Sequence, residues 1–106
     1  MDIQLVYITA SSGEEARKIA RTLVEERLAA CANLLGEINS VYWWGDAVQE
    51  DAEVALIVKS RAELVPRIVE RVRALHSYDC PCVVAIPIVG GNPDFIDWIA
   101  AETASA

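Results

Sequence analysis

Residues 38–59 read INSVYWWGDAVQEDAEVALIVK and contain two strand-like runs separated by a turn. The first run, from Ile38 to Trp44, is rich in β-branched and aromatic residues, which favour β-strands. Gly45-Asp46 is predicted to turn the chain. Val48 to Lys59 then returns as a second strand, and its end is fully apolar. The stretch predicts a long hairpin whose two strands differ in polarity.

The residues before the hairpin predict a strand and a helix. Ile3 to Thr9 is apolar on both faces, as expected for a central, buried strand. Ser12 and Glu15 have the spacing of a capping box, in which each side chain satisfies a free amide at a helix start. A single apolar helical face follows at the expected spacing: Ala16, Ile19, Ala20, Leu23, Val24 and Leu28. Gly36 is expected to form a bulge or a bend in the strand that begins at Cys31.

The residues after the hairpin predict a second helix, a strand and a short closing helix. Ser60 and Glu63 form a second candidate capping box, and Pro66 costs little if it lies near the helix start. Val83 to Val89 is predicted as a strand at a sheet edge, because its Pro87 lacks an amide donor. Residues 90–94 read GGNPD and give the closing helix an N-cap and a proline at its first position. Phe95, Trp98 and Ile99 are expected on its inner face.

These elements follow a β-α-β-β-α-β order over a single domain, residues 1–106. That order predicts an α+β, ferredoxin-like fold: a four-stranded antiparallel sheet with both main helices on one face. The other face and the aromatic end of the hairpin then remain uncovered. Val41 to Trp44 has no lysine or proline to protect an edge, so we expect another copy of the chain to cover it. A head-to-tail contact of this kind closes into a ring, and a trimer is the smallest ring beyond a dimer.

Composition excludes several classes of function. With 54% hydrophobic and 24% charged residues the chain is not disordered, and its formal net charge of -7 disfavours nucleic acid and anionic membranes. The same charge also serves simply to keep an apolar protein soluble. No stretch approaches the ~20 apolar residues of a membrane span, and the start lacks a signal peptide's basic region. We therefore expect a cytoplasmic protein whose three cysteines stay reduced.

Several segments together resemble one family. They are ERLAACAN at residues 26–33, VYWWG at 41–45, EDAEV at 50–54, KSR at 59–61 and HSYD at 76–79. In combination they are similar to the CutA divalent-cation tolerance proteins, and the resemblance runs from the first strand to Trp98. It implies a ferredoxin-like homotrimer with long hairpins that extend each sheet into its neighbour, and a role linked to copper and other divalent ions. It also implies a likeness to the PII signalling trimers, which bind nucleotides between subunits.

The chain departs from the copper-binding members that it resembles. Those members carry a cysteine where Ile8 stands and a histidine pair where this chain has Leu75-His76, so only His76 carries over. Ser77 replaces a usual proline, and Cys82 stands where an acid is common.

One candidate metal site comprises His76, Asp79, Cys80 and Cys82, close to Tyr78 in the sequence. Imidazole nitrogen and thiolate sulfur suit copper or zinc. An alternative is that the two cysteines pack as small apolar residues and that His76 caps a helix C-terminus.

A candidate ligand cleft between subunits comprises Cys31, Trp44, Lys59 and Tyr78. Tyr42, Trp43 and Trp44 are either stacking surfaces for a planar ligand or, as we favour, anchors of the trimer interface. Cys31 is best interpreted as a buried structural thiol. The acidic group Glu50, Asp51 and Glu53 either gathers cations or is a solvated strand face.

These patterns favour a protein that is not an enzyme. The leading hypothesis is a homotrimer that binds copper, another divalent cation or a small molecule at intersubunit clefts. The alternative is a PII-like signalling or scaffold trimer that binds a nucleotide or partner proteins, with Gly90-Gly91-Asn92 as its only phosphate-binding candidate. A ferredoxin-like acylphosphatase would need an arginine in the loop after the first strand, and residues 9–13 contain none.

Overall fold

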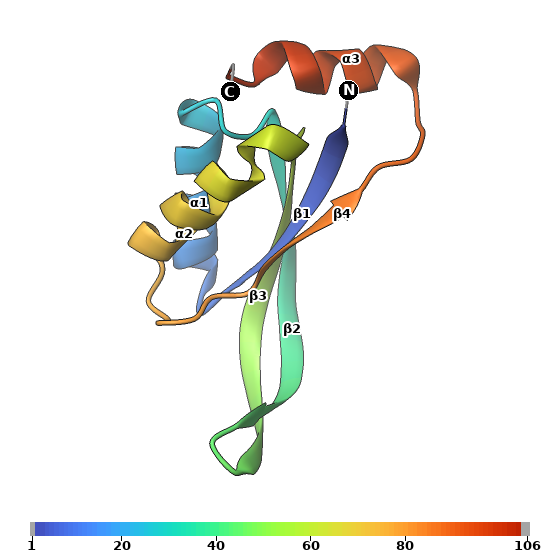
Figure 1. Cartoon of the computed structure of the whole chain (residues 1–106). Helices are drawn as coiled ribbons and strands as arrows, with labels where there is room; N and C mark the ends of the chain where they lie inside the picture. Colours follow the sequence, from blue (N-terminus) through green and yellow to red (C-terminus); the bar gives the residue numbers. More distant parts are fainter. Residues whose placement is uncertain (1, 105–106) are drawn as a thin grey trace.

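The computed structural model describes residues 2–104, which form a sheet, a pair of helices beside it and a third helix across one end (Figure 1). In chain order the elements are β1 (Ile3–Ala10), α1 (Gly13–Glu25), β2 (Cys31–Trp44), β3 (Ala47–Arg61), the 3-10 turn η1 (Ala62–Leu64), α2 (Val65–Leu75), β4 (Val83–Pro87) and α3 (Pro93–Glu102). No helix among these residues is long and apolar enough to span a bilayer.

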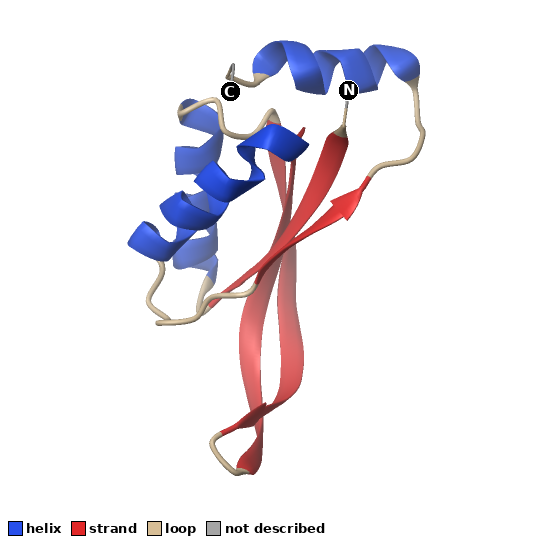
Figure 2. Ribbon diagram, viewed as in Figure 1, coloured by secondary structure: helices blue, strands red, loops and turns tan. Residues whose placement is uncertain are grey.

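The four strands form one antiparallel sheet in the order β2-β3-β1-β4. This is the predicted ferredoxin-like arrangement, with α1 and α2 on the same face (Figure 2). β1 is a central strand, and β4, which ends at Pro87, lies at an edge, as expected for a strand that contains proline. The helices leave the opposite face of the sheet uncovered, and we call it the open face.

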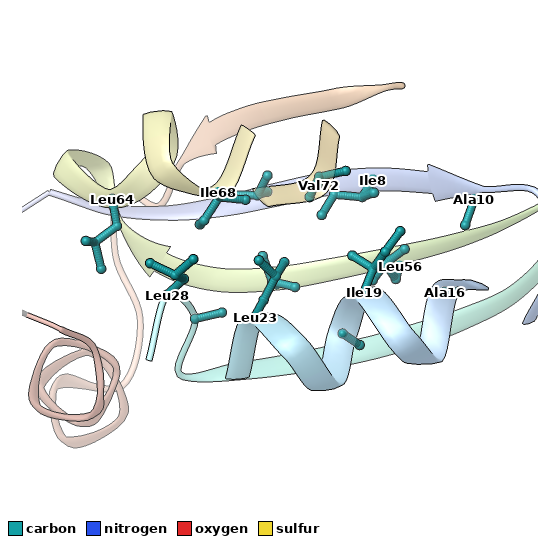
Figure 3. Close-up of a cluster of buried hydrophobic side chains, with 14 residues drawn as sticks. Ile8, Ala10, Ala16, Ile19, Leu23, Leu28, Leu56, Leu64, Ile68 and Val72 are labelled. Carbon is teal, nitrogen blue, oxygen red and sulfur yellow. The ribbon is translucent and has the colours of Figure 1, made fainter. Parts of the chain in front are cut away.

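The core lies between the sheet and the two helices (Figure 3). Side chains alternate along a strand, so Val6 and Ile8 of β1 point toward the helices while Tyr7 and Thr9 point to the open face. The residues that meet in this core are all fully buried: Val6, Ile8, Ile19, Leu23, Leu56, Val58, Leu64, Ile68 and Val72. Each large apolar side chain removed from water in this way stabilises the fold by about 1.5–3 kcal/mol.

The capping predictions are partly right. The Ser12 side chain accepts from the Glu15 amide, but the Glu15 carboxylate accepts from the Ser11 amide instead of the predicted Ser12 amide. The second predicted box is wrong, because Ser60 lies inside β3 and donates its hydroxyl to the Leu28 carbonyl at 2.6 Å. Pairing of Ser60 with Gln4 of β1 extends the strand past the point where the sequence alone predicts a helix.

The closing helix α3 begins as predicted. Asn92 accepts from the Asp94 amide at 3.1 Å, and Pro93 is the first helical residue. Its predicted inner face is only partly correct: Ile99 is buried, whereas Phe95 and Trp98 stack on each other and stay 42% and 40% exposed. The cause is the position of α3, whose small apolar cluster forms with Ile3 and Ala30 at one end of the sheet.

The hairpin of β2 and β3 extends well beyond the body of the protein (Figure 1) and gives the chain a long axis of 44 Å against 25 and 22 Å. The pairing register shifts between Leu34 and Gly36, and Gly36 has φ +102°. The predicted bend is therefore a β-bulge, and only glycine adopts this backbone conformation without strain.

Candidate functional site

A cavity of about 600 Å³ lies between the hairpin and the segment 77–82 that leads into β4. We call it the hairpin cavity. Its lining combines aromatic rings, carboxylates, thiols and hydroxyls: Tyr7, Tyr42, Trp44, Tyr78, Glu53, Asp79, Cys80, Cys82, Thr9, Ser40 and Ser77. Because Tyr7 and Thr9 alternate with core residues along β1, the cavity lies on the open face of the sheet.

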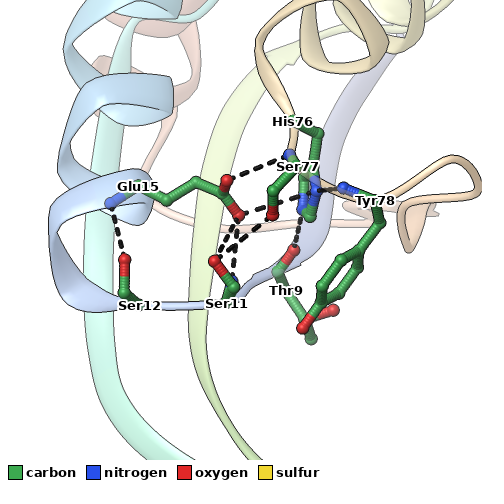
Figure 4. A network of polar contacts seen from close by, with 7 residues as sticks. All are labelled: Thr9, Ser11, Ser12, Glu15, His76, Ser77 and Tyr78. Carbon is green, nitrogen blue, oxygen red and sulfur yellow. Dashed lines mark hydrogen bonds and ion pairs between the residues drawn. The ribbon is translucent and has the colours of Figure 1, made fainter.

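His76 holds the segment 76–78 onto β1 (Figure 4). Its side chain is fully buried, and Nε2 donates to the Thr9 carbonyl oxygen at 2.8 Å. On the other side of the ring, Nδ1 accepts from the Tyr78 amide at 3.0 Å. A carbonyl can only accept and an amide can only donate, so the two contacts place a ring proton on Nε2 and make Nδ1 the acceptor; Nδ1 also lies 3.6 Å from a Glu15 carboxylate oxygen.

Glu15 holds the same segment from the start of α1 (Figure 4). One carboxylate oxygen accepts from the Ser11 amide at 2.9 Å, and the other accepts from the Ser77 amide at 3.0 Å. Burial alone would raise the pKa of Glu15, but the hydrogen bonds from Ser11 and Ser77 outweigh it and hold the pKa below its ordinary value. The carboxylate therefore stays charged and joins α1 to the wall of the cavity.

The structure divides the predicted metal ligands. Asp79, Cys80 and Cys82 line the hairpin cavity, whereas both nitrogens of His76 are engaged in hydrogen bonds to Thr9 and Tyr78, one of which would have to break for His76 to bind a metal. Within residues 2–104, no three side chains of the His, Cys, Asp and Glu types converge on one position for a metal ion. Burial raises the pKa of the Cys82 thiol, which disfavours the thiolate that would bind a metal.

The predicted cleft residues also separate into two places. Trp44 and Tyr78 line the hairpin cavity together. Lys59 and Cys31 face each other elsewhere on the sheet, where the Lys59 ammonium lies 3.6 Å from Cys31 Sγ and donates to Asn33 Oδ1 at 2.6 Å. The same ammonium lies 5.8 Å from the centre of the Phe95 ring. Cys31 and Lys59 thus form a local contact near α3.

Sequence reasoning missed Tyr7 and Thr9 as parts of the site. The signal that could have revealed them is strand alternation, because odd-numbered residues of β1 must face away from the helices. The sequence placed Glu53 in an acidic group that either gathers cations or forms a solvated strand face; in the structure it lies in the cavity wall beside Tyr78.

The cavity has a negative electrostatic environment. Burial, then the charge of Glu53 and a hydrogen bond to it, raise the pKa of Tyr78 to about 12. A hydrogen bond to Asp51 is the main cause that raises the pKa of Tyr42. Both phenols are therefore neutral at physiological pH, and the Glu53 charge acts on the space between them.

Known proteins similar to this chain share one name. The family profile described as CutA1 divalent ion tolerance protein matches residues 4–102. The divalent-cation tolerance protein CutA of Thermus thermophilus is 47% identical over 100 residues, which cover 94% of this chain and 97% of that protein. Protein CutA 1, chloroplastic, of Oryza sativa is 43% identical and matches over 93% of this chain but only 56% of its own length.

Solved structures agree with these sequence matches. The divalent cation tolerance protein Cut A1 of Thermus thermophilus superposes with a TM-score of 0.94 at 46% identity, over 96% of this chain and 99% of that one. The CutA1 crystal structure from Oryza sativa gives a TM-score of 0.97 at 40% identity, over 100% and 97% of the two chains. A structure from Archaeoglobus fulgidus, described as a periplasmic divalent cation tolerance protein CutA, superposes with a TM-score of 0.91 at 44% identity. The match covers 94% of this chain and 97% of that one.

The relatives bear on two of the predictions. Their names include a chloroplastic and a periplasmic protein, so the cytoplasmic location of this chain stays a prediction. The predicted family, by contrast, is confirmed, because the profile match, the sequence identities and the superpositions each cover nearly all of the chain. The chain belongs to the CutA1 divalent ion tolerance protein family.

Proposed function

We propose that this protein is a non-enzymatic homotrimer with a role in divalent-cation tolerance, and that it binds a metal ion or small ligand in the hairpin cavity. The observation that carries the proposal is the exposed apolar surface of the hairpin. Val41 is 65% exposed, Trp43 72% and Trp44 66%, on an edge strand. Large aromatic groups in such a position mark a surface that another protein covers.

The two edges of the sheet support assembly by a head-to-tail contact. β2 is one edge and carries the exposed aromatic residues, while β4 is the other and exposes Val84 and Ile86 on the open face. These are different surfaces, so a contact between them joins unlike patches, and a rotation of one third of a turn between copies closes such a contact into a ring of three. Trp43 alternates with Tyr42 and Trp44 along β2, so it is the aromatic residue free to meet a neighbour while the other two line the cavity.

The family name suggests a bound divalent metal ion, and the cavity has one set of candidate ligands for it. Cys80 and Cys82 are exposed residues that line the cavity, and sulfur is a ligand that copper favours, although partial burial of the Cys82 thiol disfavours its thiolate. His76 would not take part, because its nitrogens hold Thr9 and Tyr78.

The nucleotide alternative is less well supported. Among the residues that line the hairpin cavity there is no lysine, arginine or histidine to balance a phosphate. At the other candidate, residues 90–92, the Asn92 side chain already caps the Asp94 amide at the start of α3. PII-like nucleotide binding therefore stays an untested prediction that the charge of the cavity disfavours.

Sedimentation velocity on the wild type and on Trp43→Glu tests the assembly. We expect the wild type to sediment with about three times the 11.6 kDa mass of one chain, and Trp43→Glu to dissociate because a charge cannot be buried unpaired. Val24→Glu, on the helical side of the molecule, is the matched control and should remain a trimer. A monomeric wild type at micromolar concentration would contradict the proposal.

Anaerobic copper titration tests whether the cavity binds a metal ion. If the cavity thiols bind the ion, Cys80→Ser combined with Cys82→Ser abolishes binding and His76→Gln retains it. Absence of micromolar binding by the wild type would remove the metal from the proposal and leave a small ligand.

A further inference from the structure

The hairpin cavity brings together aromatic rings from three parts of the chain. Tyr7 comes from β1, Tyr42 and Trp44 come from β2, and Tyr78 comes from the segment before β4. Tyr42, Trp44 and Tyr78 all remain partly exposed, so their rings are accessible to a bound molecule. The negative face of an aromatic ring attracts cations, most strongly for tryptophan.

Two of these rings are held in place before any ligand arrives. The Tyr42 hydroxyl is hydrogen bonded to Asp51. The Tyr78 ring lies 4.6 Å from the buried His76 ring, centre to centre, and the Tyr78 amide is bonded to that same histidine. A site whose walls are fixed in advance loses less conformational entropy on binding than a flexible one.

The charged groups of the cavity wall are all negative. They are Glu53 and Asp79, and no cationic side chain accompanies them in the lining. Within residues 2–104 neither carboxylate forms an ion pair with another side chain. The field of Glu53 reaches into the cavity, since it helps to raise the pKa of both Tyr78 and Cys82. A ligand with a positive charge would therefore complement the site.

The rings favour an organic cation over an inorganic one. Hard divalent ions need several oxygen ligands around one point, and the described residues provide no such group. An organic ammonium ion attaches its charge to an apolar body that can contact the rings. The cavity volume of about 600 Å³ lies within the range of about 300–1,000 Å³ typical of small-molecule sites.

We propose that the hairpin cavity binds an organic ammonium ion with an apolar or aromatic body, held by the Glu53 carboxylate and by the rings of Trp44 and Tyr78. The inference rests on the proposed function, because it names the ligand class for the same cavity. It also distinguishes the cavity from a metal site, since the charge is recognised by ring faces and one carboxylate instead of by a coordination shell.

Calorimetry with a matched pair of probes tests the ligand class. The probes are 2-phenylethylamine, a cation at neutral pH, and 2-phenylethanol, its neutral analogue of nearly equal size. We expect the amine to bind more tightly to the wild type, by about tenfold, from its contacts with the rings and the carboxylate. Glu53→Gln and Trp44→Leu should each lower this preference from about tenfold to about threefold or less, whereas Glu14→Gln, exposed on α1 outside the cavity, should leave it unchanged.

The mass of each sample is measured alongside binding, which separates the possible failures. Equal binding of amine and alcohol, or of neither, by a trimeric wild type would overturn the ligand class and leave the trimer intact. Displacement of the amine by a lower concentration of zinc chloride, lost in Glu53→Gln, would identify an inorganic site and overturn the inference as well. A monomeric wild type would instead contradict the proposed function itself.

Discussion

Replacement of His76 should destabilise the fold, because the structure gives this residue a structural role. His76→Phe keeps a ring of similar volume but loses both hydrogen bonds. The Thr9 carbonyl is only partly accessible to water and would lose a donor, while the exposed Tyr78 amide can turn to solvent. We therefore expect His76→Phe to lower the free energy of unfolding by about 1–3 kcal/mol.

His76→Ala removes the same bonds and also empties a fully buried position. The resulting cavity adds to the loss, so the expected total is about 2–5 kcal/mol. His76→Ala should therefore be less stable than His76→Phe, because alanine loses both the hydrogen bonds and the packing, whereas phenylalanine loses only the hydrogen bonds.

Urea unfolding, followed by tryptophan fluorescence, measures both values. All samples need one protein concentration, because the stability of an assembly depends on it. Arg73→Ala, a nearby exposed residue in the last turn of α2, is the control and should change stability by less than about 0.5 kcal/mol. If both His76 variants matched this control, or if they lost copper binding at unchanged stability, the structural role of His76 would be refuted.

Three further predictions follow from Glu15, Tyr78 and Gly36. The pKa of Glu15 is lower in the folded chain than its ordinary value of 4.5, so the stability that Glu15 contributes is present above about pH 4.5 and is lost as pH falls through the folded value. The free energy of unfolding should therefore fall less steeply on the acid side for Glu15→Gln than for the wild type, and an unchanged slope would count against the prediction. The pKa of Tyr78 is raised from 10.0 to about 12, so the stability that the neutral phenol contributes is present below pH 10 and is lost as pH rises toward 12. Phenolate absorbance should show a tyrosine that titrates near pH 12 in the wild type and is absent from Tyr78→Phe. Gly36→Ala should cost about 1–3 kcal/mol of stability because φ at this position is +102°; a clash is not the cause, since no described atom lies within 4 Å of the added Cβ. Gly90→Ala also meets open space and should be nearly neutral or slightly stabilising. Equal thermal stability of the two variants would argue against backbone strain at Gly36.

Much of the fold could be predicted because its signals are local. The central position of β1, the bulge at Gly36, the edge position of β4 and the cap at Asn92 each depend on a few neighbouring residues. The prediction failed at Ser60, where a distant strand decided the outcome. A serine three residues before a glutamate reads as a helix cap, but pairing with Gln4 placed it in the sheet.

The site was less predictable, because it depends on contacts between distant parts of the chain. The candidate role of His76 as a metal ligand was reasonable for an isolated histidine near two cysteines. Its actual partner is the Thr9 carbonyl, 67 positions away, which no local pattern indicates. In the same way Tyr7 and Glu53 meet Tyr78 only because β1 and β3 are neighbours in the sheet.

Hydrogen exchange at the outer edge of β2 tests most directly whether sister copies cover the hairpin and enclose its cavity. Among residues 2–104 of a single chain, no strand pairs with the amides of β2 that face away from β3. We predict that these amides, from Val41 to Trp44, are strongly protected at micromolar concentration and lose protection in Trp43→Glu. Rapid exchange in the wild type, at the rate of an exposed loop, would show that no second copy lies on this edge and would contradict the trimer.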